Sequence, residues 1–227
     1  MNPSLRRFTI LAAAGLLTVE VHAATVPFTE TFSNGIAGWS VGGGLAPDLV
    51  ASGGADGGAY LSRVADISAS GFGNVQILFR CESGCSDDAF AGDWRDTVGT
   101  LSWYFRHDAA EPLQAYARIA TPANNPGASA VVTTLVQPDT WTLIELAIDA
   151  DNPEFISFSG RGFDAVFSNV GRLQIGIGIP TGFAATGVRF DIDQVSLAPV
   201  PLPPAAWALF GGMAMLARVR RRRTARA

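Results

Sequence analysis

The stretch LSWYFR occupies residues 101–106, and the stretch LQAYARI occupies residues 113–119. In both, every odd-numbered residue is apolar and every even-numbered residue is polar or amphipathic. Alternation with a period of two is typical of a β-strand that turns one face to a core and the other to solvent. The two stretches therefore predict adjoining strands, with Tyr104 and Tyr116 on their polar faces.

The rest of the middle of the chain has the same character. Further strands are expected at residues 75–79, 130–136, 141–148, 155–158, 173–179 and 188–197. Clusters of Gly, Pro, Asn and Asp, which favour turns, separate them at residues 42–44, 52–58, 122–127 and 180–182. Only residues 164–169 indicate a short helical turn. Many short strands joined by turns predict an all-β fold, an antiparallel β-sandwich of the jelly-roll type.

The first 23 residues have the pattern of a secretory signal peptide. Arg6 and Arg7 precede an apolar run at residues 8–19, and residues 21–23 read VHA, which suits signal peptidase. Such a segment is removed on export and takes no part in the fold. We expect cleavage after Ala23, with Ala24 as the second choice.

The chain ends in a proline-rich motif, an apolar run and an arginine cluster. The motif VPLPPA comprises Val200, Pro201, Leu202, Pro203, Pro204 and Ala205. A helix over residues 202–219 would be roughly 27 Å long, close to the thickness of the hydrocarbon core of a bilayer. The arginines that would stop it in the cytoplasm are Arg218, Arg220, Arg221, Arg222 and Arg223. We therefore expect one C-terminal transmembrane helix that anchors an exported domain, residues 24–198, to the inner membrane.

The order of VPLPPA, one hydrophobic helix and a terminal arginine cluster resembles the PEP-CTERM sorting domain of Gram-negative bacteria, in its VPLP form. Leu202 stands where the namesake motif has Glu. The resemblance implies that an exosortase, a membrane-embedded processing enzyme, acts on residues 199–227 in cells that produce exopolysaccharide. The processed protein would then reach the cell surface or the extracellular space. An ordinary tail anchor is the alternative.

The charge of the expected domain differs from that of the whole chain. Residues 24–198 contain eight arginines, no lysine and nineteen acidic residues, so their net charge is −11, against −4 for the full sequence. Binding of nucleic acid depends on basic residues that neutralise phosphates. The composition therefore argues against a nucleic-acid partner and favours divalent cations or neutral glycans.

Cys81 and Cys85 are the two cysteines, and residues 81–85 read CESGC. In an exported protein two such cysteines persist as a disulfide, and Ser83 and Gly84 supply the turn between them. A bridge across so small a loop would mainly stiffen the tip of a hairpin. The competing interpretation is a metal site, but no second cluster of Cys or His completes a set of four ligands.

Several motifs along residues 28–197 resemble the laminin B (laminin IV) module and, more broadly, galactose-binding-like jelly rolls that include many carbohydrate-binding modules. The motifs are ETFSNG at residues 30–35 with Gly-Trp at 38–39, DGGAYL at 56–61, FAGDWR at 90–95 and FDIDQVSL at 190–197. The resemblance implies that the first and last strands lie side by side.

In jelly rolls of this kind an early acidic residue and an Asp of the last strand often hold a structural Ca²⁺. The matching residues here are Glu30 with Asp191 or Asp193. Calcium takes six to eight oxygen ligands, so backbone carbonyls of the glycine-rich loop around Asp56 would have to contribute. Exposed, solvated carboxylates are the alternative interpretation.

A glycan site is the second candidate, because sugars stack on aromatic rings and accept hydrogen bonds from polar side chains. Trp94, Tyr104 and Tyr116 are the best surface candidates, since Trp94 lies in a polar loop and the tyrosines lie on polar strand faces. Trp103 is expected in the core, and Trp39 and Trp141 at the ends of the sandwich.

Catalysis is the third candidate and has little support in the sequence. After signal removal His107 is the only histidine, expected to be solvated at a strand end, and no nucleophile or phosphate-binding motif occurs. Glu111, Glu145 and Glu154 could serve a glycosidase, but nothing pairs them. We therefore expect a non-enzymatic, exported protein for adhesion within an exopolysaccharide or matrix layer. The alternative is a carbohydrate-binding module with a specific glycan, followed by a glycan hydrolase of the same fold.

Overall fold

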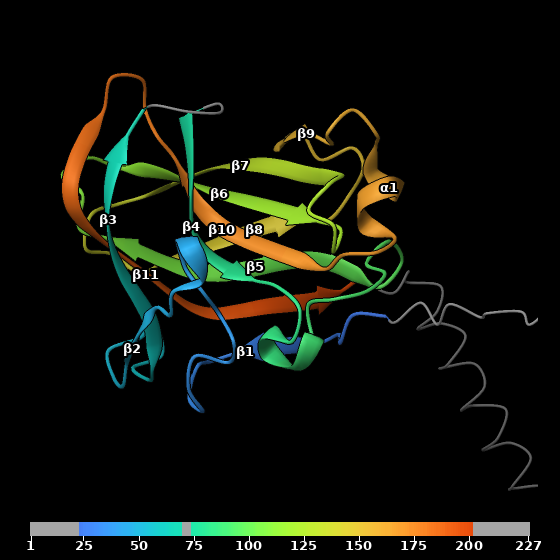
Figure 1. Cartoon of the computed structure of the whole chain (residues 1–227), viewed down its shortest axis with the longest axis horizontal. Coiled ribbons are helices and arrows are strands. Elements are labelled where there is room, and N and C mark those ends of the chain that lie inside the picture. Colours follow the sequence, from blue (N-terminus) through green and yellow to red (C-terminus); the bar gives the residue numbers. More distant parts are fainter. Residues whose placement is uncertain (1–22, 70–73, 202–227) are drawn as a thin grey trace, which may run out of the picture.

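The computed structural model describes residues 23–69 and 74–201, which form a β-sandwich of two antiparallel sheets (Figure 1). The six-stranded sheet has the order β2 (Asp48–Val50), β3 (Tyr60–Ser68), β11 (Ala184–Pro199), β5 (Val98–His107) and β8 (Thr142–Ala147), and β1 (Phe28–Glu30) also pairs with β11. The five-stranded sheet has the order β4 (Val75–Cys81), β10 (Arg172–Gly178), β6 (Leu113–Ala120), β7 (Gly127–Val136) and β9 (Phe155–Ser157). The prediction of an all-β jelly-roll sandwich is confirmed.

The alternating stretches form β5 and β6, and their apolar residues fill the space between the sheets. Leu101, Trp103 and Phe105 have no exposed surface, and the apolar residues of β6 are equally buried. The six further stretches correspond to β4, β7, β8, β9, β10 and β11, and the predicted helical turn is α1 (Phe163–Phe167). Periodicity of two thus located the strands because one face of each sheet packs against the other sheet.

The expectation that the two alternating strands adjoin one another is wrong. β5 belongs to the six-stranded sheet and β6 to the five-stranded sheet, so the chain crosses the sandwich between His107 and Leu113. Both strands turn their apolar residues inward, and their polar faces therefore point away from each other. A period of two marks which side of a strand is buried but does not say which sheet the strand joins.

β3 escaped the sequence analysis because Arg63 interrupts its apolar alternation. Leu61, Ala65 and Ile67 are buried on the inner face of β3. Arg63 takes the inward position between Leu61 and Ala65, is half-buried, and donates a 2.8 Å hydrogen bond from Nη1 to the carbonyl of Leu78. The register of β4 against β10 shifts at Leu78, since Phe79 pairs with Ile175 and Ile77 with Gly176. Arg63 thus satisfies a carbonyl at a bulge of the opposite sheet.

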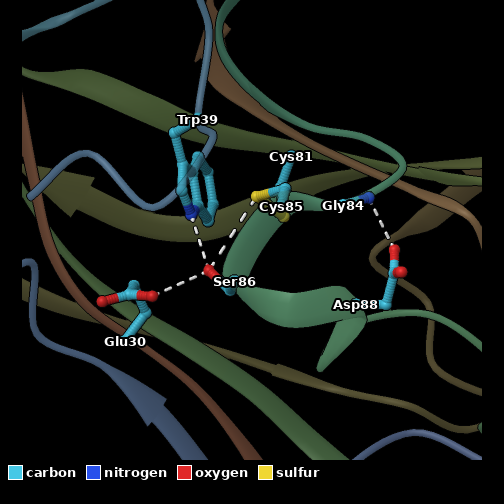
Figure 2. The surroundings of a disulfide bond; sticks show 7 residues. All are labelled: Glu30, Trp39, Cys81, Gly84, Cys85, Ser86 and Asp88. Atoms are coloured by element: carbon cyan, nitrogen blue, oxygen red, sulfur yellow. Dashed lines mark hydrogen bonds between the residues drawn. A yellow bond between two sulfur atoms is a disulfide. The ribbon is translucent and has the colours of Figure 1, made fainter.

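The disulfide is confirmed, but its setting differs from the predicted hairpin. Cys81 ends β4, and Cys85 begins a 3₁₀ turn, Cys85–Asp88, with Cα atoms 5.3 Å apart (Figure 2). β4 and the next strand, β5, lie in different sheets. The bridge therefore stiffens the point where the chain leaves one sheet for the other, and not the tip of a hairpin.

The structure corrects the predicted localisation. Within residues 23–69 and 74–201 no helix is long and apolar enough to cross a membrane, and the expected span over residues 202–219 lies outside the described part. We therefore withdraw the inner-membrane anchor. Residues 1–22 of the predicted signal peptide and the sorting motif from Leu202 onward also lie outside the described part, and the exosortase stays a prediction.

Candidate functional site

A cleft of about 790 Å³ lies on the outer face of the five-stranded sheet. Clefts of ~300–1,000 Å³ are the usual size of small-molecule sites. All five strands of the sheet or the loops beside them contribute to its lining, which comprises Val75, Gln76, Ile77, Arg80, Tyr116, Arg118, Asn124, Ser129, Ile156, Ser157, Ser159 and Gln174. The cleft therefore crosses the strands of the sheet.

One row of polar residues runs straight across this sheet. Its members are direct cross-strand partners in the order Arg80, Gln174, Arg118, Ser129 and Ser157, one from each of β4, β10, β6, β7 and β9. Neighbouring strands lie about 4.8 Å apart, so side chains of one row stand next to each other on one face. The register thus gathers five hydrogen-bonding side chains that are far apart in the sequence.

Arg118 is the centre of this row. It donates from Nη1 to Asn124 Oδ1 at 2.6 Å and to Gln174 Oε1 at 3.2 Å, and from Nη2 to the carbonyl of Asn124 at 2.6 Å. These contacts use three of the five N–H donors of the guanidinium. The remaining donors are available to a ligand in the cleft.

Gln174 supplies a further donor. Its side chain is buried, with 1% of its surface exposed, and its Nε2 has no hydrogen-bond partner within the described residues. The amide orientation is fixed by Arg118, since the reverse orientation would place two donors face to face. An unpaired buried donor costs about 1–3 kcal/mol. The residue that carries this donor lines the cleft.

Tyr116 lies in the floor of the cleft, as part of the adjacent row. Only 3% of its surface is exposed, and its hydroxyl lies 2.9 Å from Ser129 Oγ. Burial raises the pKa of Tyr116, so the hydroxyl stays protonated at neutral pH. Its burial leaves little ring for stacking, so the ring serves as floor and its hydroxyl positions Ser129.

The other two predicted glycan residues lie away from this cleft. Trp94 is fully buried, and its Nε1 donates to the carbonyl of Phe90 at 3.0 Å, so it has no face for a sugar. The polar residues around Trp94 predicted an exposed ring, but the indole turns inward. Tyr104 is half-buried on β5, where its register partners are Leu143 and Asp193. All three residues belong to the six-stranded sheet, whereas the cleft lies on the five-stranded sheet. The structure therefore does not bring Tyr104 and Tyr116 together.

Tyr104 shares the outer face of the six-stranded sheet with a group of stacked side chains. The Arg106 guanidinium lies 4.3 Å from the Trp141 ring centroid and 5.1 Å from that of Tyr60. Trp141, which was expected to plug the sandwich, is instead half-buried on this face, and its Nε1 donates to the carbonyl of Gly53 at 3.1 Å. These contacts hold the loop before β3 against the sheet.

The three predicted calcium ligands have separate surroundings. Glu30 accepts hydrogen bonds from Ser86 Oγ at 2.8 Å and from the backbone N–H of Phe32 at 3.0 Å, beside the disulfide (Figure 2). Asp191 is buried and pairs with Arg106 at 2.8 Å. β1 and β11 do pair, as the jelly-roll resemblance implied. However, the described residues contain no group of three or more His, Cys, Asp or Glu side chains that could hold a metal.

Asp193 is the one of the three that meets the glycine-rich loop. It is buried, and its carboxylate accepts from the N–H of Ala55 at 2.8 Å and of Gln194 at 2.7 Å. A Cβ on Gly54 would overlap Asp193 Oδ2 and lie 3.0 Å from the carbonyl oxygen of Gly58. Burial raises the pKa of Asp193, and Asp56 adds to this shift, despite the two N–H donors. Calcium at this loop stays a prediction.

His107 is buried at the end of β5 and is not solvated as expected. Its Nε2 lies 3.0 Å from the carbonyl of Val136, and its Nδ1 has no partner within the described residues. A carbonyl only accepts, so the proton sits on Nε2. Burial lowers the pKa of His107. This geometry suits a neutral core histidine.

No model of a protein family matches the chain, and no curated protein matches its sequence. Among solved structures, the N-terminal endo-1,4-beta-D-xylanase 10B of Clostridium thermocellum, with CBM22-1 and GH10 modules complexed with xylohexaose, is similar over 77% of this chain and 28% of that one, with 17% identity and a TM-score of 0.51. An exo-beta-agarase is similar over 78% and 25%, with 11% identity and a TM-score of 0.50. The CBM22-1 xylan-binding domain from Paenibacillus barcinonensis matches over 80% and 100%, with 15% identity and a TM-score of 0.48.

This chain thus spans little more than a quarter of the xylanase chain. At such low identity the first two likenesses show the fold, a jelly-roll sandwich, and nothing finer. The laminin B subtype stays a prediction.

Proposed function

We propose that this chain is a non-catalytic, extracellular module that binds a polysaccharide along the cleft of the five-stranded sheet. The observation that carries the proposal is the row of five polar side chains that crosses this sheet, with the unpaired Nε2 of Gln174 at its floor. A polysaccharide offers a repeating series of hydroxyl groups that such a row can bind. The lining of the cleft reaches from β4 to β9, which suits an extended ligand.

Three further features support the proposal. The fold resembles part of a xylanase chain whose modules include a family 22 carbohydrate-binding module and whose structure contains xylohexaose. The disulfide between Cys81 and Cys85 is typical of proteins in oxidising, extracytoplasmic compartments. The described lining of the cleft contains no Asp or Glu, whereas a glycosidase needs two carboxyl groups across the scissile bond. Binding without catalysis is therefore the function that the geometry supports best.

Affinity electrophoresis of the purified full chain tests the proposal. Gels would contain xylan, β-glucan, agarose, alginate or polygalacturonate, and retardation in at least one of them is expected. Ser157→Trp should abolish the retardation, because Ser157 is exposed at the β9 end of the polar row and a tryptophan there fills the cleft. Ala147→Trp is the matched control, since Ala147 is exposed on β8 of the opposite sheet.

Two results would overturn the proposal. One is unaltered migration of the wild-type chain in every polysaccharide. The other is retardation that Ser157→Trp and Ala147→Trp reduce to the same extent, because the binding surface would then lie outside the cleft.

A further inference from the structure

The charge of the cleft is opposite to that of the domain around it. Residues 24–198 contain nineteen acidic residues and eight arginines. The twelve residues that line the cleft nevertheless include Arg80 and Arg118, and none of these twelve described residues is acidic. The strand register, and not the composition, therefore sets the potential that a ligand meets here.

The positive charge of Arg118 has only neutral partners. Its hydrogen bonds go to the amide of Asn124, the carbonyl of Asn124 and the amide of Gln174. Burial lowers the pKa of Arg118, Tyr116 opposes this shift, and the nearby charges of Arg172 and Arg80 lower the pKa further. The guanidinium is thus held in place by neutral groups, with its charge uncompensated.

The neighbouring arginines share a single carboxylate. Glu82 Oε1 lies 2.7 Å from Arg172 Nη1 but 3.9 Å from Arg80 Nη1. Arg80 also lowers the pKa of Arg63, after the larger effect of burial. Glu82 therefore contacts two arginines, and Arg80 is the less closely paired of the two.

We propose that the cleft takes an anionic polysaccharide, and that a uronic acid carboxylate lies over Gln174 between the Arg80 and Arg118 guanidinium groups. The planar guanidinium fork matches a carboxylate with two parallel hydrogen bonds. Gln174 stands between the two arginines in the row, about 4.8 Å from the strand on either side, so all three side chains can reach one carboxylate. Gln174 Nε2 then gains the acceptor that the protein does not supply. This inference rests on the proposed polysaccharide binding and names its ligand class.

Isothermal titration of the full chain with a matched pair of glycans tests this inference. The probes are polygalacturonate oligosaccharides and the same oligosaccharides after chemical reduction of their carboxyl groups to hydroxymethyl groups. We expect the acidic form to bind roughly ten- to a hundredfold more tightly, the range expected for charged hydrogen bonds. This preference should shrink as salt is added, because salt screens the attraction.

Two variants locate the charge that carries the preference. Arg118→Gln should remove most of the difference between the two oligosaccharides. Arg95→Gln is the control, because Arg95 pairs with Asp93 on the surface and does not line the cleft.

The outcomes separate this inference from the proposed function. Equal affinity for the acidic and the reduced oligosaccharides, or binding of neutral xylan alone, would overturn the anionic ligand while polysaccharide binding stands. An acidic preference that Arg95→Gln reduces as much as Arg118→Gln would also overturn it. Absence of binding to every acidic and neutral glycan would overturn both.

Discussion

Arg118 donates a 3.2 Å hydrogen bond from Nη1 to Gln174 Oε1, and the two residues face each other as register partners on β6 and β10. They are 56 positions apart in the sequence. This contact occupies the Oε1 of Gln174 and leaves its Nε2 buried, with no described residue to accept its hydrogen bond. The protein therefore maintains an unsatisfied donor on a residue that lines the cleft.

Replacement of Gln174 should separate stability from binding. In Gln174→Leu the unpaired donor is lost, which removes a cost of about 1–3 kcal/mol, while Arg118 keeps both contacts with Asn124. We expect an unchanged or higher Tm by calorimetry, together with at least partial loss of polysaccharide retardation on affinity gels. Gln114→Leu, on the neighbouring strand β6 but outside the cleft lining, serves as the control and should keep binding. A Gln174→Leu variant that binds as the wild type would contradict the assigned role.

The pair formed by Arg106 and Asp191 should matter for stability and not for binding. Asp191 is fully buried, and Arg106→Met leaves its carboxylate with Arg189 Nε, at 3.4 Å, as its one ion-pair partner among the described residues. An uncompensated buried charge typically costs about 3–5 kcal/mol, and we expect the lower end of that range in denaturant unfolding. The double variant Arg106→Met, Asp191→Leu should recover much of the loss. Equal stability of the single variant and the wild type would show that Arg189 alone suffices.

His107 should make the domain less stable in mild acid. Burial lowers its pKa in the folded state, so below its ordinary pKa the unfolded chain binds a proton that the folded chain does not. The contribution of His107 to the free energy of unfolding is constant above that ordinary pKa and declines as the pH falls below it. His107→Gln retains an N–H for the carbonyl of Val136 but does not titrate. Between pH 7 and pH 5 the Tm of this variant should therefore fall less than that of the wild type, whereas parallel curves would contradict the prediction.

Gly176 should tolerate no side chain. A Cβ at this position would overlap the carbonyl oxygen of Gln76 at the β4 bulge. We expect Gly176→Ala to lower the free energy of unfolding by about 1–3 kcal/mol or more, because backbone atoms cannot move aside easily. Gly178→Ala is the matched control on the same strand face, since its Cβ would meet its nearest neighbours, in Gln114 and Val131, at an ordinary 3.7 Å. Similar Tm values for the two variants would argue against the close approach at the bulge.

Calcium, if it binds at the glycine-rich loop, should act through Asp193 and not through Glu30. Asp193 accepts a hydrogen bond from Ala55 in this loop, whereas Glu30 is engaged with Ser86 and Phe32. We expect saturating Ca²⁺ to raise the Tm of the chelator-treated wild type and of Glu30→Gln, but not that of Asp193→Ala. The absence of a calcium-dependent shift in the wild type would end the prediction.

The amino-acid pattern was sufficient to place most strands, because burial of one strand face imposes a period of two wherever the core is apolar. It failed at β3, where Arg63 occupies an inward position and bonds a bulge carbonyl of the other sheet. The disulfide also followed from the sequence, because Cys81 and Cys85 are only four positions apart and a local turn is enough to bring them together. The domain boundaries at residues 24–198 stay a prediction.

The sequence by itself determined the fold class, the disulfide and the place of Tyr116 on a polar strand face. Only the tertiary structure decided that Tyr104 and Tyr116 lie on opposite faces, that Trp94 is buried, and that Arg80, Gln174 and Arg118 form one row. The physical reason is that side-chain alternation is a local property of each strand, whereas sheet membership and register depend on pairings between distant segments. Net charge averages over the whole surface, and so the acidic composition favoured a neutral glycan, while the register concentrates positive charge in the cleft.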